Sequence, residues 1–307
     1  MKVLLTGSKG QLGNALINSK PNNIDLIATD RVQLDLENYN NCYEYICKNK
    51  PDWVINSGAY TNVDKAELEK ELVFKINFKA PEAIAKALNS YGGKLFQIST
   101  DYVFDGSKTS PYNIEDRKAP QNVYGQSKDL AEESIKKILQ EKNQFIVLRT
   151  SWLIGPVGKN FLFTIIRLLN EKEEIKVVND QIGSMTSTLS LSHIIWKLIE
   201  LNNEESLLNK SIPNFFHWSD YGILSWYDLA SAIKAICDEK SLIKKSAKII
   251  PISTEEYKFI AKRPLFSLLN CDKTEEVLGI KRNDWNESLL KIINNLLLIK
   301  SNLKKTL

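Results

Sequence analysis

The chain has 307 residues, of which 43% are hydrophobic and 25% are charged, and its net charge is +4. This composition is ordinary for a folded globular protein, and the small net charge argues against nucleic-acid binding. The longest apolar stretch, at 288–300, contains Lys291, Asn294 and Asn295, so we expect an amphipathic helix there and no membrane span. The four cysteines lack metal-ligand spacing, so we expect buried thiols in a cytoplasmic protein and no metal site.

The first half of the sequence alternates short apolar runs with helical periodicities. The runs predict strands, and the periodicities between them predict helices. The expected strands are 2–6, 25–29, 52–57, 94–99 and 145–150, and the expected helices are 12–19, 39–48, 73–90 and 124–141. This alternation predicts an α/β fold with a Rossmann-type, doubly wound parallel sheet.

The pattern changes after residues 155–156. A helix is expected over 160–174, a short strand over 175–180, and further helices from 192, over 227–238 and over 285–298. We therefore expect an NAD(P)-binding Rossmann domain over 1–154, to which a segment near 186–212 returns. Residues 155–307 are expected to form a smaller, discontinuous and mainly helical substrate-binding lobe.

Three glycines follow the first expected strand directly. Gly7, Gly10 and Gly13 have GxxGxxG spacing and stand where the first helix begins. Glycines at such a turn let the backbone approach a pyrophosphate, which the helix N-terminus then stabilises. A glycine triplet alone is also compatible with a plain turn, but its place between strand and helix favours a dinucleotide site.

Charged residues after the second expected strand bear on the choice of cofactor. Asp30 suits the 2′-hydroxyl of NAD and repels a 2′-phosphate, whereas Arg31 could pair with that phosphate. Asp35 is a candidate contact near the adenine, although a solvated turn explains Arg31 and Asp35 nearly as well. NADH and NADPH therefore both remain open.

Tyr124 and Lys128 are the strongest candidates for chemistry. They are four residues apart on an expected helix, so both side chains lie on one face. A lysine cation can lower a phenol pKa toward the working range. Thr100 or Ser99, at the end of the 94–99 strand, could hydrogen-bond a substrate carbonyl, although such residues also commonly cap strand ends.

The order of several motifs resembles that of the extended short-chain dehydrogenase/reductases. The glycine turn comes first, followed by "STDYVF" from Ser99 and "YGQSK" from Tyr124. Further segments narrow the resemblance to the dTDP-4-dehydrorhamnose reductase family, over residues 2 to about 290. These segments are "GAYTNVDKAE", "INFKAPEAIAKAL", "LRTSWLIG", "NDQIGSMTS", "SWYDLA" and "KRPLFSLLN".

The resemblance implies a role for individual residues. Tyr124 is implied as proton donor, with Lys128 as its partner and Thr100 as the assisting hydroxyl. The implied cofactor contacts are Gly7, Gly10, Gln11, Leu12, Gly13, Asp30, Asp35, Leu36, Ala59, Tyr60, Thr61, Tyr124 and Lys128. The implied substrate contacts are Thr100, Asp101, Trp152, Val63 and Arg263, with Ser267 as a weaker candidate. A buried core aromatic is a rival explanation for Trp152, and a surface turn is one for the segment around Arg263.

The activity implied is reduction of the C4 keto group of dTDP-4-dehydro-β-L-rhamnose by NADPH or NADH, which yields dTDP-L-rhamnose for cell-surface polysaccharides. Two rivals are another NDP-sugar reductase or epimerase, and a non-catalytic regulatory subunit of the same fold. The partner is then a small nucleotide sugar, and the resemblance leaves room for a homodimer. Met185 replaces the usual proline of "NDQxGxPT", and Asn14 stands where a Mg²⁺-bridging acidic residue would be expected, so the sequence does not support Mg²⁺.

Overall fold

The computed structural model of the chain describes residues 1–141, 143–208 and 211–305. Six parallel strands form its main sheet, in the order β10-β5-β4-β3-β1-β2. Their bounds are β1 (Lys2–Thr6), β2 (Asp25–Ala28), β3 (Trp53–Asn56), β4 (Lys94–Thr100), β5 (Phe145–Thr150) and β10 (Phe215–Trp218). The chain passes from β2 across to β3 on the other side of β1, so a topological switch point lies between β1 and β3.

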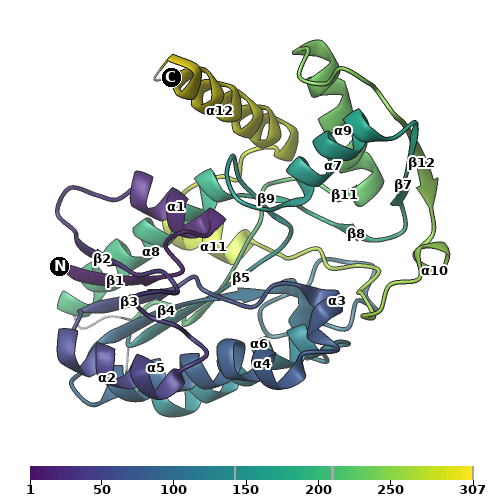
Figure 1. Ribbon diagram of the computed structural model, residues 1–307. Coiled ribbons are helices and arrows are strands. Elements are labelled where there is room, and N and C mark those ends of the chain that lie inside the picture. Colours follow the sequence, from purple (N-terminus) through teal and green to yellow (C-terminus); the bar gives the residue numbers. More distant parts are fainter. Residues whose placement is uncertain (142, 209–210, 306–307) are drawn as a thin grey trace.

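Helices cover both faces of this sheet (Figure 1). One face packs against α1 (Gln11–Asn18), α8 (Thr188–Leu207) and α11 (Asp272–Leu278), and the other against α2 (Tyr39–Asn49), α5 (Ala80–Asn89) and α6 (Val123–Ile138). The central strands are apolar at almost every position because both faces are buried. The predicted doubly wound α/β fold is confirmed.

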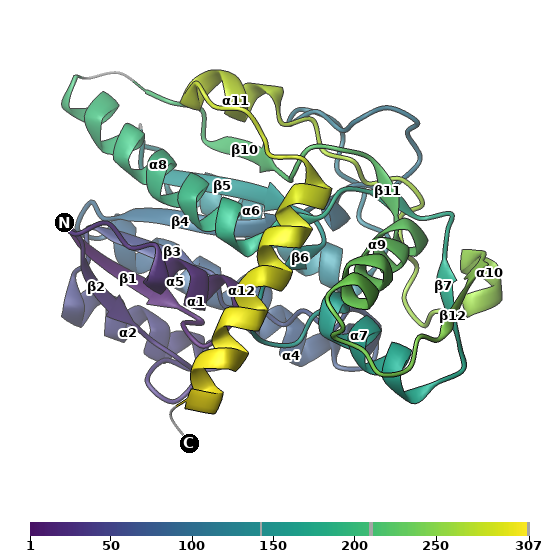
Figure 2. The same cartoon turned by 90° about the horizontal axis from the view of Figure 1, so that it is seen from above.

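Most of the remaining elements form a smaller body beside the sheet. It contains β6 (Leu153–Ile154), α7 (Phe161–Glu171), β7 (Glu174–Val178), β8 (Ile182–Gly183), β9 (Thr186–Ser187), β11 (Leu224–Ser225), α9 (Trp226–Glu239), β12 (Lys248–Ile252), α10 (Thr254–Tyr257) and α12 (Trp285–Lys305). Figure 2 shows α7, α9, β7, β12 and α10 gathered on one side of the sheet, with α12 lying across the junction. A separate apolar core holds this body together.

Several boundaries differ from those expected from the sequence. The helix expected over 73–90 is three segments, α4 (Lys70–Phe74), a π-helical turn η1 (Lys75–Lys79) and α5. The helix expected from 192 begins four residues earlier, because the Ser187 side chain accepts the N–H of Leu189 and caps it there. The sixth strand, β10, was not expected at all, and short helices α3 (Val63–Ala66) and η2 (Asp101–Val103) follow β3 and β4.

Candidate active site

The glycine turn lies at the switch point, between the end of β1 and the start of α1. Gly7 has φ +67°, a conformation that favours glycine, and an added Cβ there would lie 2.7 Å from Gly58 Cα. A Cβ on Gly13 would lie 2.2 Å from the Gly7 carbonyl oxygen. No side chain caps α1, whose N-cap is Gly10, so its first backbone N–H groups are available to an anion. This turn fits a dinucleotide pyrophosphate.

Leu12 and Gln11 belong to the same turn but can contribute to a cofactor site in different ways. Leu12 is buried in the core under the sheet, so only its backbone can face a cofactor. The Gln11 side chain accepts the Gly155 N–H at 3.0 Å and an Asn160 amide N–H at 2.7 Å. Gln11 therefore joins the glycine turn to the beginning of the smaller body.

Asp30 lies at the end of β2 next to the glycine turn. Its Oδ1 accepts the Val32 N–H at 2.8 Å, and its other oxygen pairs with Lys9. This hydrogen-bonded ion pair with Lys9 lowers the pKa of Asp30. Arg31 pairs instead with Asp35, at 3.2 Å, and with Glu37. The cation beside Asp30 is thus Lys9, which the sequence analysis did not single out.

The loop after β3 carries Ala59, Tyr60 and Thr61. The buried amide of Asn77, on the π-helical turn, accepts the Tyr60 N–H at 2.8 Å and donates to the Tyr60 carbonyl at 3.0 Å. It also donates to Ser127 on α6 at 3.1 Å. Asn77 therefore ties this loop to the helix of Tyr124. No role was expected for Asn77 from the sequence, although π-helical turns often occur at functional sites.

Leu36 and Asp35, two further predicted cofactor contacts, lie in the loop that follows Asp30. Leu36 is buried and lies against Gly58, where an added Cβ would come within 2.7 Å of the leucine methyl group. The Asp35 carboxylate accepts the Glu37 N–H at 3.0 Å. Both residues therefore shape the loop beside the glycine turn.

The candidate reactive groups meet at the carboxyl end of β4. Thr100 ends this strand, and its hydroxyl donates to the Asp101 carboxylate at 3.0 Å. Tyr124, in the first turn of α6, packs edge-on against Tyr102 at 5.9 Å. The Thr100 hydroxyl interacts with the Tyr124 phenol and lowers its pKa, but burial outweighs this and holds the pKa well above its usual range.

Lys128 lies one turn further along α6 and is buried. Its ammonium donates to the Ile98 carbonyl at 2.6 Å, and burial lowers its pKa to about 8. The Lys128 ammonium is directed toward the backbone of β4, and the expectation that it lowers the pKa of Tyr124 stays a prediction. The Tyr124 phenol is protonated at neutral pH, and its burial makes it a weaker acid than a free tyrosine.

Asp101 and the C-terminal loop close this end of the site. Burial raises the pKa of Asp101 to about 6, against the opposing effect of the Ser267 and Thr100 hydroxyls. Arg263 pairs with Asp64, next to Val63, at 2.8 Å and interacts with the Tyr102 phenol. The structure thus brings the loop around Arg263 and Ser267 onto the reactive strand end. A surface turn does not account for these contacts.

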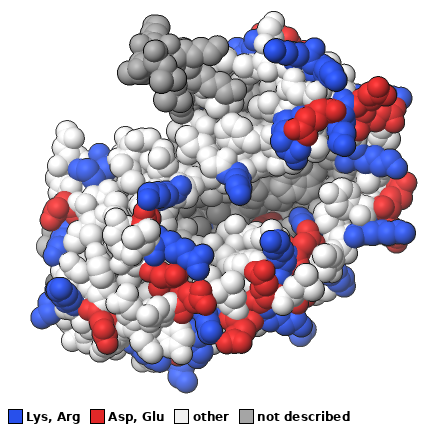
Figure 3. All heavy atoms as spheres, viewed as in Figure 1, with Lys and Arg blue, Asp and Glu red and all other residues white. Residues whose placement is uncertain are grey.

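Trp152 follows β5 and is half-buried between the sheet and the smaller body. Its indole stacks on that of Trp226, with centroids 3.8 Å apart and planes inclined by 15°. The predicted residues therefore follow β1, β3, β4 and β5, whose carboxyl ends lie at one edge of a parallel sheet. The surface is hollowed between the two bodies, and Lys and Arg side chains lie on both sides of this hollow (Figure 3).

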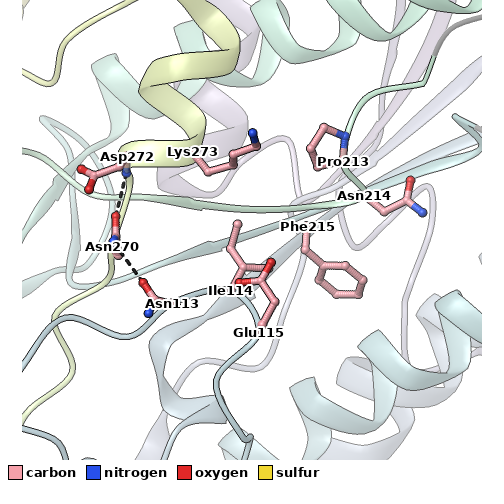
Figure 4. Close-up of a pocket in the computed structure, with 9 residues that line it drawn as sticks. All are labelled: Asn113, Ile114, Glu115, Pro213, Asn214, Phe215, Asn270, Asp272 and Lys273. Atoms are coloured by element: carbon pink, nitrogen blue, oxygen red, sulfur yellow. Dashed lines mark hydrogen bonds between the residues drawn. The ribbon is translucent and has the colours of Figure 1, made fainter.

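A separate surface pocket of about 330 Å³ lies beside the beginning of β10. Asn113, Asn270 and Phe215 are among its lining residues, and the two asparagine side chains are hydrogen-bonded at 3.0 Å (Figure 4). None of its lining residues is a predicted site residue, and Phe215 is at the opposite end of its strand from the reactive edge. This pocket therefore has no part in the candidate site.

Within the part of the chain that the structure describes, no group of three or more His, Cys, Asp or Glu side chains could hold a metal ion. In the same residues, no helix is both long and apolar enough to cross a membrane. Asn14, at the position of interest for Mg²⁺, accepts a hydrogen bond from Asn18 at 3.1 Å.

Comparison with known proteins agrees with this geometry over nearly the whole chain. The model of the family described as "RmlD substrate binding domain" matches residues 1–298. A dTDP-4-dehydrorhamnose reductase from Sinorhizobium fredii is 34% identical over 298 residues, which are 97% of this chain and 98% of that protein. The match therefore includes the smaller body as well as the nucleotide-binding half.

Two solved structures are similar in fold and in sequence. A dTDP-4-dehydrorhamnose reductase from Clostridium acetobutylicum superimposes with a TM-score of 0.88 at 37% identity, covering 97% of this chain and 100% of that one. A dTDP-4-dehydrorhamnose reductase from Bacillus anthracis, solved in complex with NADP, gives a TM-score of 0.85 at 34% identity, covering 96% and 99%. The chain belongs to the RmlD substrate-binding-domain family, and these dTDP-4-dehydrorhamnose reductases are among its relatives.

Proposed function

We propose that the protein reduces the C4 keto group of dTDP-4-dehydro-β-L-rhamnose with NADPH or NADH and releases dTDP-L-rhamnose, an activated sugar for cell-surface polysaccharides. The carbonyl carbon gains a hydride and the carbonyl oxygen gains a proton, so the ketone becomes a secondary alcohol. The bound nicotinamide supplies the hydride. The arrangement that carries this proposal is Thr100, Tyr124 and Lys128 gathered at the end of β4, beside the glycine turn.

Tyr124 is the proton donor in this proposal. Its phenol is protonated at neutral pH, so the proton is in place when negative charge develops on the substrate oxygen. The Thr100 hydroxyl, which interacts with the same phenol, stabilises the phenolate that forms. Proton donation and phenolate stabilisation thus come from two neighbouring side chains.

Lys128 assists both Tyr124 and the cofactor in this proposal. Its buried ammonium is fixed by the Ile98 carbonyl, and in our proposal it holds the nicotinamide ribose and places positive charge near the developing phenolate. Gly7, Gly10 and Gly13 receive the pyrophosphate, and Asp30 with Lys9 faces the adenosine ribose. Trp152, Asp101 and Arg263 border the sugar nucleotide.

The two rivals are disfavoured by different observations. A sugar epimerase needs the nucleotide-binding half but not this particular lobe, whereas the family match extends to residue 298. A regulatory subunit needs no proton donor, whereas Thr100 interacts with the Tyr124 phenol and Lys128 lies one turn further along the same helix.

The test uses wild-type protein with enzymatically prepared dTDP-4-dehydro-β-L-rhamnose and either NADPH or NADH. We expect oxidation of the cofactor together with an equal amount of dTDP-L-rhamnose, identified by chromatography and mass spectrometry. Incubation with UDP-glucose is the control for an epimerase and should give no UDP-galactose. Cofactor binding without any oxidation would contradict the proposal and favour the regulatory rival.

Three further expectations belong to this proposal. We place the protein in the cytoplasm, where buried thiols such as Cys42 and Cys271 stay reduced. We assign nucleotide binding to residues 1–154 with the returning segment near 186–212, and substrate binding to 155–307. A homodimer stays a prediction.

A further inference from the structure

Trp152 has an unusual backbone conformation. Its φ is +43°, in the left-handed region that bulky residues rarely adopt. Such a conformation is strained and persists only where the surroundings enforce it. The Trp152 carbonyl accepts the Thr186 N–H at 3.2 Å, and β6, which follows directly, pairs with β9. The backbone of Trp152 is therefore fixed by strands of the smaller body.

Trp226 fixes the indole of Trp152 from the side of the smaller body. The two rings are parallel and in contact, and Phe161 packs on the Trp226 ring with a centroid distance of 4.6 Å. Trp226 is the first residue of α9, and a reciprocal capping box between Ser225 and Asp228 holds this helix end. The stack thus rests on a well-anchored helix terminus.

Gly183 provides the space that the Trp152 indole needs. An added Cβ would lie 3.0 Å from Cζ2 and 3.1 Å from Cε2 of that ring. Its φ is not in the left-handed region, so glycine is needed there for room and not for conformation. Gly183 in β8 pairs with Leu224 in β11, two residues before Trp226. The pairing of β8 with β11 therefore positions both Gly183, which leaves room for the indole, and Trp226, which stacks on it.

The same glycine connects the indole to the reactive end of the sheet. The added Cβ would also lie 3.2 Å from Ser267 Oγ, and Ser267 interacts with the Asp101 carboxyl next to Thr100. The Trp152 ring and the reactive strand end therefore flank one glycine. A flat apolar surface at this place suits the apolar face of a deoxysugar ring.

We propose that Trp226 is a positioning residue for the reductase. Trp226 holds the indole of Trp152 in a fixed position beside the bound sugar, although the Trp152 backbone is strained. Gly183 leaves the space that this indole occupies. Neither Trp226 nor Gly183 touches the reacting atoms. This inference rests on the proposed function, because it concerns binding of that sugar nucleotide.

The test compares Trp226→Ala, Trp226→Phe and Gly183→Ala, with Tyr227→Ala as matched control. Tyr227 is the next residue of α9 and packs in the same apolar core, but no ring contact joins it to Trp152 among the described residues. We expect Trp226→Ala and Gly183→Ala to raise KM for the sugar nucleotide about three- to tenfold, with little change in kcat or in the Kd of NADPH. Trp226→Phe should restore most of the wild-type KM.

Circular dichroism supplies a readout that does not depend on turnover. Stacked indoles couple as excitons, so Trp226→Phe and Trp152→Phe should each remove the same signal, whereas Tyr227→Ala should keep it. An active wild type whose Trp226→Ala variant has the KM of the Tyr227→Ala control would overturn this inference alone. A wild type that binds NADPH but does not reduce the sugar nucleotide would overturn the proposed function and the inference with it.

Discussion

Replacing Arg149 by methionine removes one half of a buried ion pair. Arg149 and Glu132 are 3% and 0% exposed, and they form two parallel hydrogen bonds, Nε to Oε1 at 3.0 Å and Nη2 to Oε2 at 2.8 Å. The Ser99 hydroxyl donates to the same carboxylate at 2.5 Å. The pair thus joins β5, α6 and the strand end that presents Thr100.

The expected loss of stability follows from the burial of the Glu132 carboxylate, which would remain without its main partner. Breaking a buried pair by removing one partner typically costs about 3–5 kcal/mol. Lys118 remains 3.3 Å from Glu132 and is itself 17% exposed, so part of the charge stays compensated and we expect about 3 kcal/mol. At about 2.1 cal/mol/K of unfolding entropy per residue, this lowers Tm by roughly 5 °C.

Differential scanning calorimetry of Arg149→Met measures this loss. The exposed Arg167–Glu171 pair is the matched control, and Arg167→Met should cost less than about 1 kcal/mol. The double variant Arg149→Met/Glu132→Leu should regain much of the lost stability, because it leaves no unpaired carboxylate. The reasoning is refuted if Arg149→Met is no less stable than Arg167→Met, or if the double variant is the least stable of the three.

Three further predictions concern the site itself. Burial raises the pKa of Asp101 from 3.8 to about 6, so the ionised carboxylate destabilises the fold above about pH 6. Asp101→Asn should therefore raise Tm relative to the wild type at about pH 8 but not at about pH 4, while turnover falls. A Tm difference between variant and wild type that is the same at both pH values would contradict this. Gly13→Ala places a Cβ 2.2 Å from the Gly7 carbonyl oxygen, so the turn must distort and the Kd of NADPH should rise at least about tenfold. A titration that gives the wild-type Kd would show that the turn accommodates the added methyl group and would contradict this prediction. Because burial lowers the pKa of Lys128 to about 8, NADPH should bind more weakly as the pH rises through that value. The Kd of NADPH for Lys128→Arg should not change over the same pH range. A wild-type Kd that is independent of pH would exclude a charged Lys128 as a cofactor contact.

The sequence was sufficient to predict the elements whose periodicity is strong. The strands around Leu4, Val54 and Val147 are continuous apolar runs because helices cover both faces of the sheet. β10 escaped prediction because its four residues include His217, which is buried and contacts Arg149 at 3.2 Å. Burial lowers the pKa of His217 to about 3, so the imidazole is neutral in the core. The local sequence does not show that this residue is buried in a strand.

The candidate site was predicted in part, through motifs and order along the chain. Tyr124 and Thr100 come together because α6, which follows β4 in the chain, begins at the edge of the sheet where β4 ends. The ion pair of Lys9 with Asp30 and the three hydrogen bonds of Asn77 depend on segments far apart in the sequence. The strained backbone of Trp152 likewise depends on tertiary contacts, and no local pattern predicts them.

In the mechanism that we propose, Tyr124 protonates the C4 oxygen of dTDP-4-dehydro-β-L-rhamnose. The most direct test of this step is single-turnover reduction of this sugar nucleotide by NADPH, with wild-type protein and Tyr124→Phe, together with the Kd of NADPH for both. We predict the same Kd and a rate lower by about 10²- to 10⁴-fold in the variant, the usual contribution of a general acid. A variant that forms dTDP-L-rhamnose at near the wild-type rate would contradict the account.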